Sequence, residues 1–254
     1  TTAAGNFTHT YADGGAGGTA RTVTVSATDE DGTFVLGSKS LTVNNVAPLI
    51  ALAGAGSIAE GASYTLTLGA VTDPGTETVT SYVVHWGDGN SDTYSTGGDV
   101  THVYADGAAS PTITVDLVDE DGTHTNAGAK SITVTNVAPT ASVTGADTVA
   151  EGSVYALSVG AVSDPGTDTR TGYSIDWGDG TVQNLTSAEW TAAAGSFTHV
   201  FTDDENGPVN ATPRTVTVSA TDEDGTFTLG SKSLTVNNVA PTIALAGANS
   251  VVED

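Results

Sequence analysis

The sequence contains no cysteine and no methionine among its 254 residues. The lack of cysteine excludes disulfides. The chain therefore either works in a reducing compartment or is extracellular and stabilised by other means, for which a bound metal ion is the obvious candidate. The sequence also lacks a recognisable secretion signal and any apolar run long enough to cross a bilayer. We therefore predict no membrane insertion within these residues.

Positive charge is also scarce. Six Lys and Arg stand against 30 Asp and Glu, which gives a formal net charge of −24. This balance argues against nucleic acid and anionic membranes as partners, because binding to phosphate needs clustered basic residues. It favours divalent cations, basic surfaces or a salty medium that screens the self-repulsion. Aromatic residues make up only 6% of the chain, so we expect a core built mainly from Val, Leu, Ile and Ala.

What the sequence does contain is a set of phrases that recur in a fixed order. They are Trp-Gly-Asp-Gly at 86 and 177, Asn-Val-Ala-Pro at 45, 136 and 238, and Asp-Glu-Asp-Gly-Thr at 29, 119 and 222. Such recurrence is the signature of a tandem array. The spacing of roughly 90 to 100 residues is the usual size of a small β-sandwich with its own core.

The repeats predict four segments. Residues 1–45 match the C-terminal half of a repeat, 46–137 and 138–239 are complete repeats, and 240–254 match the first strand of a further repeat. The second complete repeat carries two insertions, near residues 181–196 and 202–213. Both fall between strands, where insertions are tolerated best.

Apolar residues alternate with Thr, Ser and Asp through most of each repeat, as in Tyr64, Leu66 and Leu68. This period of two is typical of half-buried antiparallel strands. The alternation also argues against disorder, the rival reading of such high charge. Residues 187–195 could hold a single helical turn. We expect seven strands in the first complete repeat, near 48–53, 63–71, 79–86, 90–95, 99–104, 111–118 and 129–135.

Together these phrases resemble the PKD domain, an immunoglobulin-like β-sandwich of surface and secreted proteins. In the second complete repeat the resemblance is carried by Asn136–Pro139, Ser163–Gly166, Trp177–Gly180, Thr198–Phe201 and Val218–Gly225. It implies an all-β chain of tandem, seven-stranded antiparallel sandwiches with an extracellular or cell-surface location. PKD domains serve as spacers, adhesive modules and accessory domains beside enzymes, and some bind calcium near the linker between domains.

Acidic turns are the main candidates for a site. In a seven-stranded sandwich the turn after the second strand, the turn after the sixth strand and the residue before the first strand share one end, here called the N-terminal pole. Calcium takes six to eight oxygen ligands in loose geometry, so three loops can supply it. The alternative is that Asp-Gly and Asp-Pro-Gly only form turns. The predicted calcium ligands, supported by the resemblance, are Asn45, Asp73, Asp119 and Asp121 in one repeat and Asn136, Asp164, Asp222 and Asp224 in the next.

The opposite pole is acidic as well. In a string of repeats it would face the N-terminal pole of the next repeat, so a cation between them would offset the repulsion. Solvated surface charge is the simpler explanation. The residues concerned are Glu60, Asp88 and Asp106, and in the next repeat Glu151, Asp179 and Asp203.

Several other residues invite two interpretations. Trp86 and Trp177 fall on inward strand positions and are expected in the core, rather than on a sugar-stacking surface. Trp190 lies in an insertion, where a surface contact is plausible. The histidines at 9, 102 and 199 are expected to hydrogen-bond to a neighbouring loop, since no second ligand stands at zinc spacing. The sequence Asn-x-Thr at Asn6, Asn184 and Asn210 is a glycosylation acceptor, although so short a motif arises often by chance.

No catalytic constellation stands apart from the repeat, so we predict that the chain is not an enzyme. The first hypothesis is a structural or adhesive extracellular segment that calcium stiffens. Its partners would be neighbouring repeats and other copies of the chain. It could assemble into a fibre if residues 240–254 of one copy add a strand to residues 1–45 of another. The alternative is a carbohydrate- or protein-binding accessory module of a larger secreted protein, using the two inserted loops.

Overall fold

The computed structural model describes residues 5–203, 211–247, 249–250 and 253. The chain divides into two compact units, Thr1–Asn136 and Val137–Asp254. Strands make up nearly all of the regular structure, and the described residues contain one short helix. The prediction of an all-β chain of tandem immunoglobulin-like sandwiches is confirmed.

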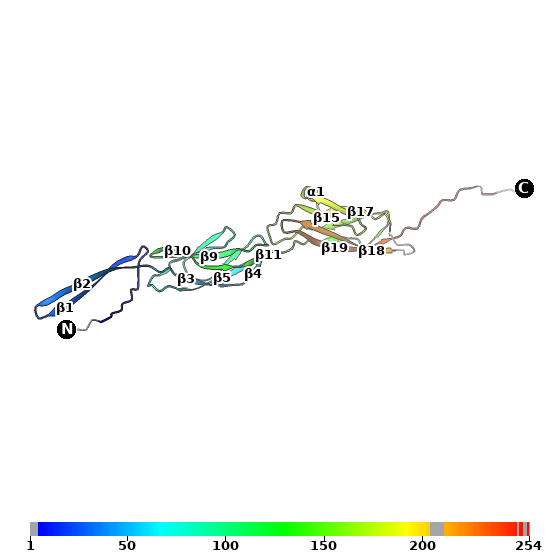
Figure 1. Ribbon diagram of the computed structural model, residues 1–254. Helices are drawn as coiled ribbons and strands as arrows, with labels where there is room; N and C mark the ends of the chain where they lie inside the picture. The colour runs from blue at the N-terminus through cyan, green and yellow to red at the C-terminus, as the bar shows by residue number, and fades with distance from the viewer. Residues whose placement is uncertain (1–4, 204–210, 248, 251–252, 254) are drawn as a thin grey trace. The chain divides into compact units, whose positions relative to one another are not determined.

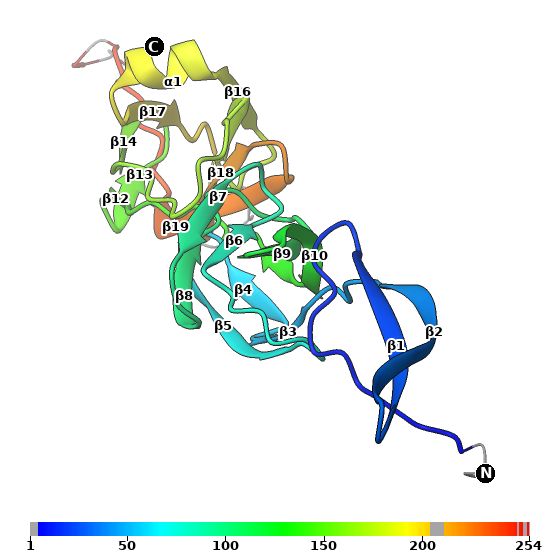
Figure 2. The same ribbon diagram turned by 90° about the vertical axis from the view of Figure 1, so that its left-hand side faces the viewer.

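Unit 1 opens with an antiparallel hairpin formed by β1 (Thr19–Asp29) and β2 (Gly32–Val43). Its strands alternate Thr or Ser with Val, residues whose side chains suit a pleated surface. The hairpin is a sheet of its own, and within the described residues no second sheet covers it (Figure 1, Figure 2). Consequently Val23 and Val25 remain 45% and 56% exposed.

The rest of unit 1 is a sandwich, here called the first module. Two antiparallel sheets face each other, one of three strands and one of four. A short parallel pair closes one side of the sandwich. The first sheet has the order β3 (Leu49–Gly54), β5 (Ser63–Thr72), β8 (Gly98–Val103). The second has the order β10 (Gly122–Ser131), β9 (Thr112–Asp119), β6 (Ser81–His85), β7 (Ser91–Tyr94). The parallel pair is β4 (Ser57–Ala59) with β11 (Thr133–Thr135).

The core of the first module lies between these two sheets. Trp86, directly after β6, is fully buried, and Leu66 of β5 and Val115 of β9 face it from the two sheets, all at 0% exposure. The expectation that Trp86 and its counterpart Trp177 are core residues is confirmed, since Trp177 is 2% exposed. Each module therefore carries its own apolar centre.

Unit 2 contains the second module, which repeats this plan. One sheet has the order β12 (Val143–Gly145), β14 (Val154–Val159), β17 (Ser196–Val200). The other has the order β13 (Thr148–Ala150), β19 (Thr226–Asn237), β18 (Ala211–Thr221), β15 (Gly172–Asp176), β16 (Val182–Thr186). Here the short parallel strand β13 pairs directly with β19.

The inserted segment after β16 forms α1 (Ser187–Ala193), visible above its module in Figure 2. Thr186 caps it, because its hydroxyl accepts from the Glu189 N–H while the Glu189 carboxylate accepts from the Thr186 N–H. This reciprocal capping box satisfies two of the N–H groups left without partners at a helix start. The helical turn expected at residues 187–195 is therefore present as two turns.

The strand predictions for the first module hold with two corrections. The last strand, expected at 129–135, begins instead at Gly122 and is broken at Ile132 into β10 and β11. A bulge around Asn126, whose φ is 55°, disrupts the alternation there and hides the early half of the strand from a period-two search. The short strand β4 was not predicted, because three residues carry too little pattern.

Candidate cation-binding site

The loop between β5 and β6 supplies the first part of the site. Asp73 folds the loop by accepting a hydrogen bond from the Gly75 N–H, 2.9 Å away. The side chain of Glu77 then folds back over Gly75, so closely that a Cβ on residue 75 would lie 2.4 Å from the Glu77 carboxyl carbon. A larger residue at position 75 would therefore displace the Glu77 carboxylate from this place.

The tight turn between β9 and β10 supplies the second part. Asp119 Oδ1 accepts from the N–H groups of Asp121 and Gly122, at 2.9 and 3.2 Å. Asp119 itself is 7% exposed and pairs with His124 Nε2, 2.9 Å from its other oxygen. The turn therefore fixes Asp121, and Glu120 links this turn to the first loop by accepting from the Thr78 N–H at 2.9 Å.

The third part comes from the loop before the hairpin. Asp13 precedes β1, and its Oδ1 accepts from the Gly15 N–H at 2.8 Å. One carboxylate oxygen from each of Asp13, Glu77 and Asp121 lies within 4.8 Å of the other two. A cavity of about 70 Å³ adjoins them, with Asn45 and Tyr11 in its wall.

Negative charge in this cluster is not neutralised by a basic side chain. In the described part of the chain, no Lys, Arg or His forms an ion pair with the three acids. Both Glu77 oxygens and Asp121 Oδ2 are shielded from solvent, and apart from the contact of the Glu77 carboxylate with its own main-chain N–H they have no partner among the described residues. These oxygens are costly to bury unless a cation or a proton accompanies them.

The pKa of Glu77 reflects this crowding. Its own backbone N–H lowers the pKa, but burial and the negative charges of Asp73, Asp13 and Asp121 together raise it above the ordinary value. The direction is that expected for like charges that share a site. A bound divalent cation would reverse it by favouring the ionised carboxylate.

The arrangement fits calcium chemically. Calcium–oxygen distances are about 2.3–2.6 Å, so two ligands of one ion are separated by at most about 5 Å. The carboxylate oxygens meet that limit. Asp13, Glu77 and Asp121 would hold the ion, and water or main-chain carbonyls of the loops would complete its six to eight ligands.

Of the residues predicted for this repeat, only Asp121 belongs to the three-carboxylate cluster. Asp73 lies beside it and acts through its charge, Asp119 is buried beneath with His124, and Asn45 lines the cavity. Glu77 and Asp13, the other two acids of the cluster, were not predicted from the sequence as candidate ligands. Asp13 is the repeat counterpart of Asp106, which was assigned to the opposite pole. The hypothesis of a cation between two facing poles could therefore have pointed to Asp13.

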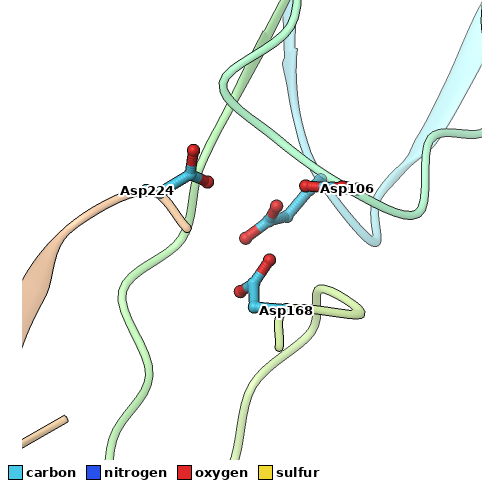
Figure 3. A group of neighbouring side chains, drawn as sticks. Asp106, Asp168 and Asp224 are labelled. Carbon is cyan, nitrogen blue, oxygen red and sulfur yellow. The ribbon is translucent and has the colours of Figure 1, made fainter. Parts of the chain in front are cut away.

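The second module builds the same two loops. Asp222 Oδ1 accepts from the N–H groups of Asp224 and Gly225, at 3.0 and 3.1 Å. Oxygens of Asp168, the counterpart of Glu77, and of Asp224 lie within 4.8 Å of each other. Figure 3 shows these two side chains on their loops; it also labels Asp106, which follows β8 in the first module. The same acidic corner is thus formed in both modules.

One difference separates the two modules. Asp164, whose side chain is 2% exposed, pairs with Arg170 at 3.1 Å. The first module has Val79 at the position of Arg170. The second module therefore has a cation of its own beside its acidic corner.

The remaining predicted residue of this set, Asn136, lies elsewhere. Its side-chain nitrogen and oxygen are buried without a hydrogen-bond partner among the described residues. Its backbone packs on Gly107, where a Cβ would lie 2.6 Å from the Asn136 nitrogen. Within unit 1 it is therefore placed beside the loop after β8.

The repeated histidines stabilise the fold. His102 stacks on Trp86 at a centroid distance of 4.7 Å, and its Nε2 lies 2.7 Å from Asp88 Oδ2. His199 repeats this on Trp177, with Nε2 2.6 Å from Asp179 Oδ2. The expectation that these histidines bond to a neighbouring loop is confirmed. His9 packs edge-on against Tyr11 at 4.6 Å.

Trp190 is less available for a surface contact than its place in an insertion indicates. Its ring stacks on Tyr173 at 4.1 Å and leans on Phe197 at 5.0 Å. Part of it remains open beside a cavity that Val159, Val162 and Ala194 also line. Among the glycosylation candidates, Asn6 and Asn184 are exposed, and Asn210 lies outside the described residues.

Comparison with known proteins gives only distant similarities. No protein-family model matches the chain, and no curated protein matches it. Among solved structures, it is similar to the fibronectin(III)-like modules of Clostridium thermocellum CbhA, with 15% identity, a TM-score of 0.30, and coverage of 80% of this chain and 100% of that one. It is also similar to three N-terminal domains of the bacteriophage RB49 Highly Immunogenic Outer Capsid protein, with 17% identity, a TM-score of 0.30, and coverage of 75% and 58%.

Among the described residues, no helix has the length and apolar character needed to cross a bilayer.

Proposed function

We propose that this chain is a non-catalytic structural or adhesive segment of an extracellular or cell-surface array of PKD-type repeats, stiffened by calcium. In this proposal, residues 46–137 and 138–239 are complete repeats, residues 1–45 are the second half of another, and 240–254 begin a further one. The fixed order of the repeated phrases and the two sandwiches support it.

The observation that carries the calcium proposal is the meeting of Asp13, Glu77 and Asp121 from three loops. Asp13 belongs to the 1–45 repeat and the other two acids to the first module. An ion held by all three would tie the preceding repeat to the module. Near this ion, Asp73 would add negative charge and Asn45 an amide oxygen. In the second module, Asp164, Asp222 and Asp224 would play the same part at that module's own acidic corner.

Calorimetric titration of the chain with calcium tests this proposal. Replacing Asp121 by Asn removes one negative ligand, and we expect calcium to bind at least about tenfold more weakly, because a charged hydrogen-bonded or ligating group is worth more than about 1.4 kcal/mol. The matched control is Asp31→Asn, the same change in the same loop sequence of the hairpin, where the described residues form no acidic cluster. Equal affinity for both variants and the unmodified chain would disprove the proposed site.

A second candidate function is that of a carbohydrate- or protein-binding accessory module. The cavity of about 270 Å³ beside α1, with the open part of Trp190 in its wall, favours it. Glycan-array binding that disappears in Trp190→Ala, while circular dichroism shows an intact fold, would support this function. An array without signal would leave the structural role as the better account.

A further inference from the structure

The hairpin of unit 1 has the sequence of a covered sheet, but none of the described segments covers it. Val25 and Leu36 are 56% and 67% exposed. Their repeat counterparts in the second module, Val218 and Leu229, are 0% and 3% exposed, although the surrounding phrases are nearly identical. An apolar face of this kind is normally buried in a sandwich.

The two modules show which segment covers that face. In the first module, Ile50 and Leu52 of β3 lie over Gly128, so closely that a Cβ on Gly128 would be 2.7 Å from Ile50 Cγ2 and 3.2 Å from Leu52 Cγ. The hairpin counterpart of Gly128 is Gly37, and nothing lies within 4 Å of a Cβ built there. We call the space above Gly128, which the covering strand enters, the glycine notch. The hairpin has the same notch at Gly37, and it is open.

The second module gives the hydrogen bond that accompanies this packing. Ala141, at the position of Ile50, donates its N–H to the Leu229 carbonyl at 2.8 Å. Gly230 beneath it would place a Cβ 2.7 Å from the Ala141 carbonyl oxygen and 2.9 Å from Val143 Cγ2. The covering segment is therefore held by the same notch and by one main-chain bond.

The chain carries a third copy of the covering segment. Residues 240–247 read Ala-Pro-Thr-Ile-Ala-Leu-Ala-Gly and differ from residues 47–54 only by Thr242 in place of Leu49. Ile243 and Leu245 match Ile50 and Leu52, yet they are 83% and 89% exposed. One chain thus carries both an exposed apolar face, on β1 and β2, and an exposed segment, residues 240–247, whose sequence matches the strand that covers such a face.

We propose that residues 240–247 of one copy dock on the β1–β2 face of a second copy. Ile243 and Leu245 then lie over Gly37, and the Ile243 N–H donates to the Leu36 carbonyl. The segment carries no charged residue, so docking adds no like-charge contact to a strongly acidic chain. This inference rests on the proposed structural role, since a head-to-tail contact of this kind extends into a filament.

Sedimentation velocity of the whole chain over a range of concentrations tests the proposal. We expect reversible association that Ile243→Asp weakens at least about tenfold, because a buried branched side chain contributes more than about 1.4 kcal/mol. Thr242→Asp is the matched control, because it adds the same charge at a position that should stay exposed after docking. Its counterpart in the first module, Leu49, is exposed although its strand is packed. Gly37→Val should block association by filling the notch, whereas Ser38→Val should not.

Cross-linking fixes the register. Because the chain has no cysteine, a Leu36→Cys variant mixed with an Ile243→Cys variant should form a heterodimeric disulfide on mild oxidation, and Thr242→Cys should not replace Ile243→Cys. A chain without association, an association equally affected by Ile243→Asp and Thr242→Asp, or a cross-link between all cysteine pairs alike would overturn the proposal. Each test is run in calcium and in chelator, so that the docking proposal can be judged separately from the calcium proposal. Association that is the same in both conditions would support docking even if no calcium binds.

Discussion

Asp179 offers a prediction that can be worked out in full. It belongs to the Trp-Gly-Asp-Gly turn of the second module and accepts hydrogen bonds from His199 Nε2 at 2.6 Å and from the Thr181 N–H at 2.9 Å. Burial raises the pKa of this carboxyl, but the bonds from Thr181 and His199 outweigh it and lower the pKa to about 2. The ionised form is therefore the one that the fold stabilises.

The size of the effect follows from that shift. A fall from the ordinary 3.8 to about 2 corresponds to about 2 kcal/mol of folding free energy. Because the folded-state pKa is depressed, this stability is fully present above the unfolded-state pKa. It is lost as the pH falls from about 5 to about 2, when the proton binds to the folded form as well.

Urea unfolding followed by NMR signals of β15 and β18 measures the second module directly. Asp179→Asn should lower its unfolding free energy by about 2 kcal/mol at pH 7 and by much less near pH 2. Asp176→Asn, at the exposed end of β15 next to that turn, removes the same charge and is the matched control. If Asp179→Asn costs the same at both pH values, the ionised carboxylate is not the source of the stability and the reasoning fails.

Three further predictions concern packing and charge. Gly128→Val should destabilise the first module by about 1–3 kcal/mol through overpacking, whereas Gly37→Val should change the hairpin little; thermal unfolding compares them. Tyr104→Phe removes the hydroxyl that donates to the buried Trp86 carbonyl at 3.0 Å, so calorimetry should show a loss of about 1–2 kcal/mol. Arg170→Val removes the built-in cation of the second module, so its melting temperature should fall in chelator and recover with calcium; no calcium effect would argue against a shared site design.

The sequence predicted the sandwiches well because period-two alternation and turn residues are local signals. Val23, Val25 and their counterparts show the strand face directly, and Trp86 and Trp177 fall on inward positions at matching places in the repeat. The strand β10 was harder, because the bulge at Asn126 breaks the alternation that a sequence pattern depends on.

The acidic cluster could be predicted only in part. The turns that contain Asp73 and Asp121 follow from topology, which places loops two and six at one pole. Glu77 is recruited because its side chain folds back over Gly75, and that conformation leaves no trace in a residue pattern. Asp13 lies in residues 1–45, which we predict to be part of a different repeat. Its place therefore depends on how the loop before β1 meets the module rather than on spacing within one repeat.

The central claim is that a cation at Asp13, Glu77 and Asp121 stiffens the connection between the 1–45 repeat and the first module. Amide ¹⁵N relaxation of the chain, recorded in chelator and in saturating calcium, tests it most directly. We predict that calcium raises the order parameters of the amides at 11–14 and 75–78 from below about 0.6 toward about 0.85, and that Asp121→Asn abolishes the change while Asp31→Asn does not. Order parameters that stay the same in saturating calcium would contradict the account.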